Sequence, residues 1–277
     1  MTLKVTKKQQ SFTGVPAGGV AGTAQCVLTL GLSVEQIAFT YSGVTLAQMT
    51  GIRILANGKE VMNFRSGTEL DAFNTYSGRA AAAGILVVDF CRYGMRTRMA
   101  EEMTKFGTGF PYNGDKKSPL FNPVEVTLLT MEIDISAAAA GAVLVAYALS
   151  SDPAPTGVIQ KVKRFQPAFN AGETQIDNLP RGDIMNTVFA NAADITALRV
   201  ERDGYTVFDR PDALNDLFQN DGVRVASAAY FVYDPTENGN GSEGLVTSNV
   251  GDLRFIYTKT GAAAVPMTVF YIGYLGA

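Results

Sequence analysis

The hydrophobic residues of the chain fall into short runs, each bounded by residues that favour turns. The runs are rich in β-branched and aromatic residues, and glycine and proline recur between them, as in β-strands joined by turns. About eight such strands in roughly 130 residues predict a sandwich or jelly roll rather than alternating strands and helices. The runs interpreted as strands are Ala24–Leu30, Ile37–Tyr41, Gly84–Phe90, Val124–Ile133, Ala142–Ala148, Thr174–Asn178, Thr187–Ala190, Val225–Tyr233, Leu253–Tyr257 and Pro266–Tyr274.

A stretch of turn-forming residues divides the chain near its middle. Residues 150–157 read Ser-Ser-Asp-Pro-Ala-Pro-Thr-Gly and lie between two apolar regions, which is typical of a linker. Charge divides at the same place: residues 1–150 carry 13 basic and 11 acidic side chains, and residues 151–277 carry 10 and 15. We therefore predict an N-terminal domain over residues 1–152 and a C-terminal domain over residues 153–277.

The two halves contain matching hairpins. Residues 49–61 and 195–207 each read as strand, turn and strand, with Asn57-Gly58 and Asp203-Gly204 as the turns. A threonine, an arginine, the turn glycine and the closing valine all match at a constant offset of 146 residues. Asn-Gly and Asp-Gly are strong hairpin signals because a tight turn of this kind needs positive φ.

A short helix is predicted after the first hairpin. Ser66 and Glu69 have the spacing of a capping box, in which the two side chains serve backbone N–H groups that have no partner in the helix. The helix is expected to run through Leu70 and Phe73 and to stop by Gly78.

A second helix is predicted at the corresponding place in the second half. We expect Asp209 to cap it, Pro211 to lie in its first turn, Leu214 and Leu217 to supply its apolar face, and Gly222 to end it.

A third match lies upstream, where residues 21–25 (Ala-Gly-Thr-Ala-Gln) resemble residues 171–175 (Ala-Gly-Glu-Thr-Gln). Three matches in the same order indicate an internal duplication. The sequence therefore predicts an all-β protein of two tandem eight-stranded jelly rolls, a double jelly roll with short helices in its loops.

The absence of histidine narrows the chemistry, because imidazole is the commonest general base and metal ligand. Cys26 and Cys91 are the only cysteines, and their spacing excludes a structural zinc site and does not support a disulfide framework. We predict that both are buried free thiols, which suits assembly in a reducing cytoplasm. No nucleophile pattern accompanies the carboxylate pairs Glu101-Glu102 and Glu132/Asp134, and we predict that the protein is not an enzyme.

No segment is predicted to cross or enter a membrane as a helix. Residues 1–10 carry Lys4, Lys7 and Lys8, but no apolar stretch follows them, so they do not form a secretory signal. Residues 135–149 are too short for a span, and residues 261–277 are interrupted by proline and glycine. The sequence therefore predicts a soluble protein.

Two glycine-rich loops imitate nucleotide-binding motifs. Residues 239–244 match G-x-G-x-x-G, but strand-like sequence follows where the mechanism requires a helix. Residues 109–116 resemble a phosphate-binding loop, but Asp115 stands where the lysine must be. We predict surface loops at both places and no required cofactor.

One acidic loop is a weak candidate for calcium. Asp234, Glu237, Asn240 and Glu243 place several oxygens close together, as calcium binding requires. These residues lack the register of a known calcium loop, and a solvated acidic loop is the alternative interpretation.

Basic residues gather in one segment that has little strand character. Arg92, Arg96, Arg98 and Lys105 lie there together with two glutamates, and no aromatic residues alternate with them as in single-stranded nucleic-acid binding. The segment is interpreted as a charged surface or one side of a subunit contact, and no direct nucleic-acid binding is expected.

Several motifs spread over the chain resemble those of corticovirus major capsid proteins, and they occur in the same order. They are Tyr41-Ser42-Gly43-Val44-Thr45, Gln48, Ile52-Arg53-Ile54, Asn57-Gly58, Glu132-Ile133-Asp134, Ala138-Ala139-Ala140-Gly141, residues 176–181, Asp252-Leu253-Arg254 and Tyr271-Ile272-Gly273. The resemblance covers nearly the whole chain, except loops such as residues 107–122 and 234–244, which are interpreted as outward-facing and variable.

This resemblance implies a structural coat protein of a membrane-containing icosahedral bacteriophage. It implies a homotrimer whose six jelly rolls imitate a hexagon and tile a shell over an internal lipid membrane. The implied partners are neighbouring capsomers, penton proteins and minor membrane-associated capsid proteins, and the implied place is the virion, assembled in the host bacterial cytoplasm. Calcium is associated with the family, without a ligand set that can be carried over.

Two other functions remain open from the sequence. A carbohydrate- or receptor-binding β-sandwich would show exposed aromatic platforms, whereas most tyrosines here lie within strand patterns. A jelly-roll enzyme of the cupin type would hold its metal largely through histidine, which this chain lacks. The basic start of the chain is expected either to face the inner lipid or a membrane protein, or to be a disordered solvated terminus.

Overall fold

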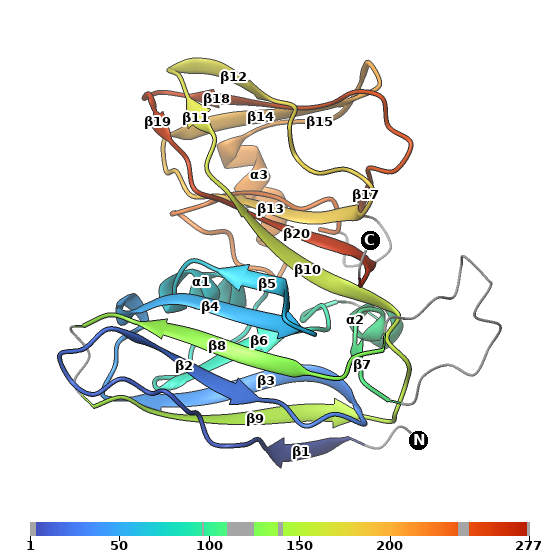
Figure 1. Ribbon diagram of the computed structural model, residues 1–277. Coiled ribbons are helices and arrows are strands. Elements are labelled where there is room, and N and C mark those ends of the chain that lie inside the picture. The colour runs from blue at the N-terminus through green and yellow to red at the C-terminus, as the bar shows by residue number, and fades with distance from the viewer. Residues whose placement is uncertain (1–3, 96, 110–124, 138–140, 238–243, 276–277) are drawn as a thin grey trace.

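The computed structural model describes residues 4–95, 97–109, 125–137, 141–237 and 244–275. Strands stacked in layers make up most of it, with short helices between them (Figure 1). The elements of the first half are β1 (Val5–Lys8), β2 (Gly22–Val27), β3 (Ser33–Ser42), a 3-10 turn (Leu46–Gln48), β4 (Met49–Ala56), β5 (Lys59–Phe64), α1 (Gly67–Tyr76), β6 (Ile85–Asp89), α2 (Arg98–Glu102), β7 (Phe106–Gly107), β8 (Leu129–Ile135) and β9 (Val143–Ser151). Those of the second half are β10 (Val158–Phe165), β11 (Ala168–Phe169), β12 (Gly172–Ile176), β13 (Ile184–Ala190), β14 (Ile195–Arg202), β15 (Tyr205–Pro211), α3 (Asp212–Gln219), β16 (Phe231–Tyr233), β17 (Leu245–Val246), β18 (Leu253–Lys259), β19 (Ala263–Ala264) and β20 (Met267–Tyr274).

Each half of the chain is a jelly roll of two packed antiparallel sheets. The first half has the strand orders β1-β9-β3-β6 and β2-β8-β4-β5, and the second half repeats them as β10-β20-β13-β16 and β12-β18-β14-β15. The predicted fold of two tandem eight-stranded jelly rolls is therefore confirmed. The first roll ends at Ser151 and the second begins at Val158, so residues 152–157 of the predicted linker connect them, whereas Ser150 and Ser151 belong to β9.

One sheet runs through both rolls. β5, at the edge of a first-roll sheet, pairs in parallel with β10, at the edge of a second-roll sheet, with Met62 opposite Val162. In Figure 1 this shared sheet lies between the layer of β9 and β3 below and the layer of β18 and β14 above.

Both predicted hairpin turns are present at equivalent tips. Asn57 and Gly58 connect β4 to β5 with φ of 51° and 77°, and Asp203 and Gly204 connect β14 to β15 with φ of 49° and 82°. Two consecutive residues with positive φ define the tight primed turn that the Asn-Gly and Asp-Gly dipeptides predicted. The superposition of the two hairpins at one offset is thereby confirmed.

The first turn residue also anchors a distant loop in each roll. The Asn57 side-chain oxygen accepts hydrogen bonds from the N–H groups of Thr127 (2.9 Å) and Leu128 (3.1 Å), just before β8. The Asp203 carboxylate accepts from the N–H groups of Gly251 and Asp252 (2.9 Å each), just before β18. This second use of the turn residues was not predicted, because it depends on strands about 70 and 50 residues away coming to the same place.

The first predicted helix is confirmed with one change in its cap. The N–H of Glu69 donates to the Ser66 hydroxyl (3.1 Å), as a capping box requires. The Glu69 carboxylate, however, accepts from the N–H of Arg65 (2.6 Å), one residue before the cap. The helix ends at Tyr76, and Gly78 follows with φ of 82°.

The second predicted helix is present, but two details of its start are wrong. Pro211 is the N-cap residue and does not lie in the first turn of the helix. Asp209 does not cap it, because β15 continues to Pro211 and places Asp209 in the ladder opposite Arg199. Leu214 and Leu217 form an apolar face, but that face is exposed, and the buried residues of α3 are Asn215 and Gln219. The period of a helix gives an apolar stripe but does not say whether the roll or the solvent covers it.

Among the strands longer than two residues, three differ most from the prediction, and the two-residue strands β7, β11, β17 and β19 were not predicted. Only Phe231–Tyr233 of the predicted strand over 225–233 pairs in a sheet, because the residues before it form a loop. β1 and β10 were missed, since lysine and arginine interrupt their apolar pattern. They occupy the same position in their two rolls.

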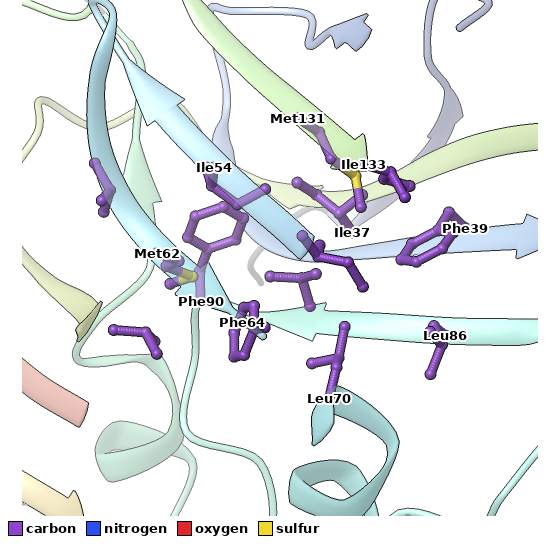
Figure 2. Packing of buried hydrophobic residues seen from close by; sticks show 14 of the residues in the cluster. Ile37, Phe39, Ile54, Met62, Phe64, Leu70, Leu86, Phe90, Met131 and Ile133 are labelled. Carbon is purple, nitrogen blue, oxygen red and sulfur yellow. The ribbon is translucent and has the colours of Figure 1, made fainter. Parts of the chain in front are cut away.

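The hydrophobic core is continuous from the first roll into the second. Ile37 and Phe39 of β3 and Ile54 of β4 gather between the sheets of the first roll (Figure 2). The same cluster includes Phe189 and Phe270 from the second roll, which also has a cluster of its own. The two cysteines are buried and unpaired, as predicted. Within the described ranges, no helix is long and apolar enough to cross a bilayer.

Candidate functional site: the junction between the two rolls

A buried aromatic contact joins the two rolls. The ring of Phe73, on α1 of the first roll, lies 4.2 Å from that of Phe189 in β13 and 5.3 Å from that of Phe270 in β20, between centroids. Tyr76 meets Phe189 edge to face at 5.2 Å. Each such pair contributes about 0.5–1.5 kcal/mol beyond its buried area. The helix α1 is therefore held against the outer face of the second-roll sheet.

A fully buried carboxylate, Asp234, lies beside this aromatic contact. Its Oδ2 atom accepts from the Tyr76 hydroxyl (3.0 Å) and from Arg224 Nε (3.1 Å), and lies 3.6 Å from Arg92 Nη2. Its Oδ1 atom accepts from the N–H and the hydroxyl of Thr236 (2.9 and 2.5 Å). Tyr76 and Arg92 belong to the first roll and the other residues to the second, so this carboxylate links the rolls.

The two arginines donate further hydrogen bonds, although the buried Nε of Arg92 has no partner among the described residues. Arg92 donates to the hydroxyls of Thr187 (2.8 Å) and Thr236 (2.6 Å). Arg224 donates to the Asp221 carboxylate (3.1 Å) and to the carbonyl of Thr236 (2.8 Å). Buried charges are tolerated when they are paired and hydrogen-bonded in this way, and removing one partner leaves the others uncompensated.

The electrostatics of the cluster keep Asp234 ionised. Burial raises the pKa of its carboxyl, but Arg92, Arg224 and the donors of Thr236 outweigh burial and hold the pKa below its ordinary value. Burial and the neighbouring Asp234 carboxylate raise the pKa of Tyr76 well above its ordinary value, so the phenol keeps its proton and donates it.

A second polar link crosses the junction at Glu69. Its Oε1 atom accepts from the hydroxyl of Thr268 in β20 (2.7 Å), and Arg65 donates to the carbonyl of Met267 (3.0 Å). Burial raises the pKa of Glu69 against the lowering effect of these donors. The junction thus combines an apolar centre with polar links at its sides.

The calcium candidates do not form a set of free oxygens. Asp234 is occupied by the contacts given above, and both oxygens of Glu237 accept from Arg210 (2.8 and 2.6 Å). Asn240 and Glu243 lie outside the described residues. Among the residues that the structure describes, no group of three or more Asp, Glu, Cys or His could hold a metal ion. A calcium ion at this loop stays a prediction.

The basic segment divides between the junction and the surface. Arg92 was expected on a charged surface or in a subunit contact. It lies instead in the junction between the rolls, where it forms an ion pair with the buried Asp234. Arg98 is half exposed and pairs with Glu101 and Glu102 within α2. Arg96 lies outside the described residues.

The carboxylates Glu132 and Asp134 share one cation. Arg53 on β4 lies between them, with Nη2 3.1 Å from Glu132 Oε2 and Nη1 2.5 Å from Asp134 Oδ2. Burial raises the pKa of Asp134, but the hydrogen bonds from Arg53 and Thr23 lower it below its ordinary value. Glu132 and Asp134 belong to one of the motifs that resemble those of the capsid proteins, and Arg53 belongs to another. The three side chains therefore form one partly exposed ion-pair group.

The basic start of the chain is ordered. Val5–Lys8 forms β1 at the edge of a sheet, paired with β9, and Lys4 makes an ion pair with the buried Glu35. The expectation of a disordered terminus is therefore wrong for residues 4–8, since a backbone ladder and a buried charge hold them. Lys7 and Lys8 remain exposed.

Other predicted loops lie mostly beyond the described part of the chain. Of the two glycine-rich motifs, only Gly109 and Gly244 are described, so the prediction of surface loops there stays a prediction.

Two buried asparagines that anchor helices to strands were not predicted. Asn74 on α1 donates to the carbonyl of Val87 in β6 (3.0 Å), and Asn215 on α3 donates to the carbonyl of Val232 in β16 (2.8 Å). Each fixes a helix to the same strand of its roll. Asparagine in the middle of a short helix was the available signal, because it is an unfavourable residue there unless it serves a partner.

Two family models match the chain. Residues 6–151 match the viral coat protein P2 N-terminal domain, and residues 159–275 match the viral coat protein P2 C-terminal domain. The major capsid protein P2 of Pseudoalteromonas phage PM2 is 24% identical over 267 residues, which are 95% of this chain and 96% of that protein.

Solved structures share the fold over the whole chain. The crystal structure of the major capsid protein P2 from bacteriophage PM2 has a TM-score of 0.88 with 24% identity, covering 99% of this chain and 98% of that one. The crystal structure of the STIV MCP has a TM-score of 0.65 with 13% identity over 99% and 97%. PBCV-1 VP54, fitted into a reconstruction of the virophage Sputnik, has a TM-score of 0.60 with 9% identity over 99% and 94%.

Proposed function

The chain belongs to the viral coat protein P2 family, and from this premise we propose that it is the repeating unit of an icosahedral phage shell. Its role is that of a major capsid protein, a structural component of the virion. The comparisons support this coat role and give no support to a carbohydrate- or receptor-binding module.

The observation that carries the proposal is the set of buried contacts between the two rolls. Phe73 with its two aromatic partners and the buried Asp234 fix the two rolls into one block. A shell subunit needs this property, because a hinge between its rolls would spread the positions of its outer contacts and weaken assembly.

Three copies are proposed to form the capsomer. Two similar but unequal rolls allow three chains to fill six nearly equivalent positions, so that a homotrimer imitates a hexagon and tiles the shell. Six rolls in a closed ring also protect sheet edges that an isolated chain leaves open.

The remaining partners follow from the same proposal. They are neighbouring capsomers, penton and minor membrane-associated capsid proteins, and an internal lipid membrane, with assembly in the host cytoplasm and no direct contact with nucleic acid. The two buried free thiols suit a reducing compartment. Catalysis forms no part of the proposed role, and calcium is proposed as optional, because arginines already neutralise Asp234 and Glu237.

The mass of the purified chain in solution tests the proposal. Sedimentation equilibrium should give three times the 29.5 kDa chain mass. The trimer should persist on dilution, as expected of an obligate interface. A chain that stays monomeric at high concentration would contradict the proposed trimer.

Flotation with anionic vesicles tests the proposed nearness of lipid. Lys7 is exposed and gains about 1 kcal/mol near anionic headgroups, so the chain should float with anionic vesicles and not with neutral ones. Replacing Lys7 by Gln should weaken flotation without disturbing β1, and unchanged flotation would remove the lysine contribution.

A further inference from the structure

The helix α3 presents an apolar face, Leu214 and Leu217, that the described part of the chain leaves exposed. Leu217 and Leu214 are 69% and 39% exposed, and the neighbouring Phe218 is 51% exposed with the Arg210 guanidinium 4.6 Å from its ring centroid. The opposite face is held by Asn215 and Gln219, which both donate to the carbonyl of Val232. An apolar group of this size on a soluble protein usually marks an interaction surface.

The other roll shows what such a face contacts. Asn74 fixes α1 to the carbonyl of Val87 as Asn215 fixes α3 to that of Val232, on the equivalent strands β6 and β16. With these anchors aligned, Leu214 takes the position of Phe73. By the same alignment Leu217 takes the position of Tyr76. In the first roll these two positions are buried against the sheet of the second roll, through Phe189 and Phe270.

The receiving surface has an equivalent on the first roll as well. Phe189 pairs with Val232 across β13 and β16, as Ala38 pairs with Val87 across β3 and β6. Ala38 is thus the first-roll equivalent of Phe189, and it lies on the outer face of the sheet β1-β9-β3-β6.

Leu149 corresponds to Phe270 by the same reasoning. Phe270 lies opposite Thr187, two residues before Phe189. Leu149 lies opposite Gln36, two residues before Ala38. Ala38 and Leu149 are only half-buried, and Val143 and Ile85 on the same face are 58% and 40% exposed. In the part of the chain that the structure describes, the α3 face and this outer sheet face are therefore both exposed apolar surfaces.

The sheet edges repeat this relation. Within the chain, the edge strand β5 meets the edge strand β10, and Arg164 of β10 donates to the Asn63 side chain of β5 (2.9 Å). Their equivalents, β15 on the second roll and β1 on the first, are also edge strands, and each pairs on one side only within the described sheets.

The hydrogen-bonded pair Arg164 and Asn63 between β10 and β5 corresponds to two oppositely charged residues on the edge strands β1 and β15. Asp209 lies opposite Arg199 as Asn63 lies opposite Arg53, so Asp209 is the equivalent of Asn63. On the first roll, Lys8 lies opposite Tyr147, which pairs on its other side with Ala38. On the second roll, Arg164 lies opposite Thr268, which pairs on its other side with Phe189, the equivalent of Ala38. Lys8 is thus the equivalent of Arg164, and both Lys8 and Asp209 are exposed.

We propose that the contact between the rolls of one chain recurs between chains: the α3 face and β15 edge of one copy cover the outer β3-β9 face and β1 edge of a second copy. This inference rests on the proposed self-assembly and names its interface. Leu214 and Leu217 lie over Ala38 and Leu149 of the next copy, and Asp209 faces its Lys8. The contact is head-to-tail, and such contacts close into a ring when the rotation between subunits allows it.

Mixing two complementary variants tests the head-to-tail contact. Leu217→Asp disables the helix face and Leu149→Asp the sheet face, and each alone should associate at least about 30-fold more weakly than the wild type in sedimentation velocity. An equimolar mixture should form heterodimers and no larger closed species, since one intact helix face meets one intact sheet face. Val20→Asp, at an exposed valine away from both faces, is the control and should assemble normally.

A charge reversal gives a second test that does not threaten the fold. Lys8→Asp and Asp209→Lys each place like charges together and should weaken association about threefold or more, and the double variant should recover it. Circular dichroism and the unfolding midpoint verify that each variant is folded.

The outcomes separate this inference from the proposed function. If the wild type assembles and Leu217→Asp assembles equally well, or if the double charge variant recovers nothing, the interface is wrong while the coat role stands. If the mixture of the two aspartate variants stays monomeric while each is folded, the head-to-tail pairing is wrong. A wild-type chain that never associates contradicts the proposed self-assembly itself.

Discussion

At the scale of single residues, the molecule concentrates its buried charges where the rolls meet. Asp234 is wholly buried, accepts hydrogen bonds from Arg224, Tyr76 and Thr236, and forms a second ion pair with Arg92. Such a group stabilises the fold only while all its partners are present, because each remaining charge becomes costly when one is lost.

Asp234→Asn is expected to destabilise the chain by about 3–5 kcal/mol, since it leaves two buried arginines without their counter-charge. Chemical unfolding in urea measures this difference. Asp152→Asn, at an exposed position in the connection between the rolls, is the control and should change the free energy of unfolding by less than about 0.5 kcal/mol. Equal losses for the two variants would remove the special role of Asp234.

The pH dependence of stability should carry a signature of Asp89. Burial raises the pKa of Asp89 to about 6, against the lowering effect of Arg79, whose Nη2 lies 2.6 Å away. The unfolded carboxyl titrates near about 3.9, so the folded chain binds the proton more tightly, and this contribution is present below pH ~4 and lost as the pH rises through about 6.

Compared with Asp89→Asn, the wild type should therefore lose on the order of 1 kcal/mol of stability per pH unit between about pH 4 and pH 6. Urea unfolding of both proteins across this range gives the two slopes. Parallel slopes would show that Asp89 titrates normally in the folded chain.

At the scale of elements, the two rolls share the same hairpin turn and the same helix anchor, but the outer faces of their helices α1 and α3 have different surroundings. Both hairpin turns have positive φ and dock the loop before β8 or β18, and both helices are fixed by one asparagine. The helices differ on their outer faces: Phe73 and Tyr76 are buried by the other roll, whereas Leu214 and Leu217 are exposed. The element is thus set locally, and its role depends on its neighbour.

Gly58→Val and Gly204→Val should each cost about 1 kcal/mol or more, because a β-branched residue at positive φ is strained. No atom obstructs a side chain at either glycine, so backbone conformation alone is tested. Gly157→Val is the matched control, since Gly157 also has open space but lacks positive φ. Midpoints indistinguishable from that of the control would argue against primed turns.

At the scale of the whole molecule, the shared sheet and the continuous core make the two rolls one unit. The first-roll cluster extends to Val162, Phe189 and Phe270 of the second roll, and β5 pairs directly with β10. The rolls are therefore expected to unfold together, in one transition.

Phe73→Ala should weaken that coupling and cost about 3–5 kcal/mol, because it empties the centre of the junction. Thermal unfolding should then change from one transition to two as the rolls separate. Tyr274→Ala, which removes an exposed aromatic ring, serves as the control and should leave a single transition. A single transition at an unchanged midpoint for Phe73→Ala would contradict the coupling of the rolls.

The class of fold, the duplication and the hairpin tips were all predictable from the sequence. Strand periodicity and the requirement of Asn-Gly and Asp-Gly for positive φ are local properties, and they act wherever the segment lies. The same local information predicted the Ser66 cap and the buried thiols Cys26 and Cys91.

Which faces and charges are buried could not be predicted from the sequence, because burial depends on contacts between segments that are far apart in the chain. Arg92 looked like a surface charge and Asp234 like a loop ligand until the rolls brought them within 3.6 Å of each other. β1 and β10 depended on pairing with distant strands, because their basic residues hide the apolar period. The apolar face of α3 could be read from its period, but its exposure could not, since burial depends on what the rest of the chain places against it.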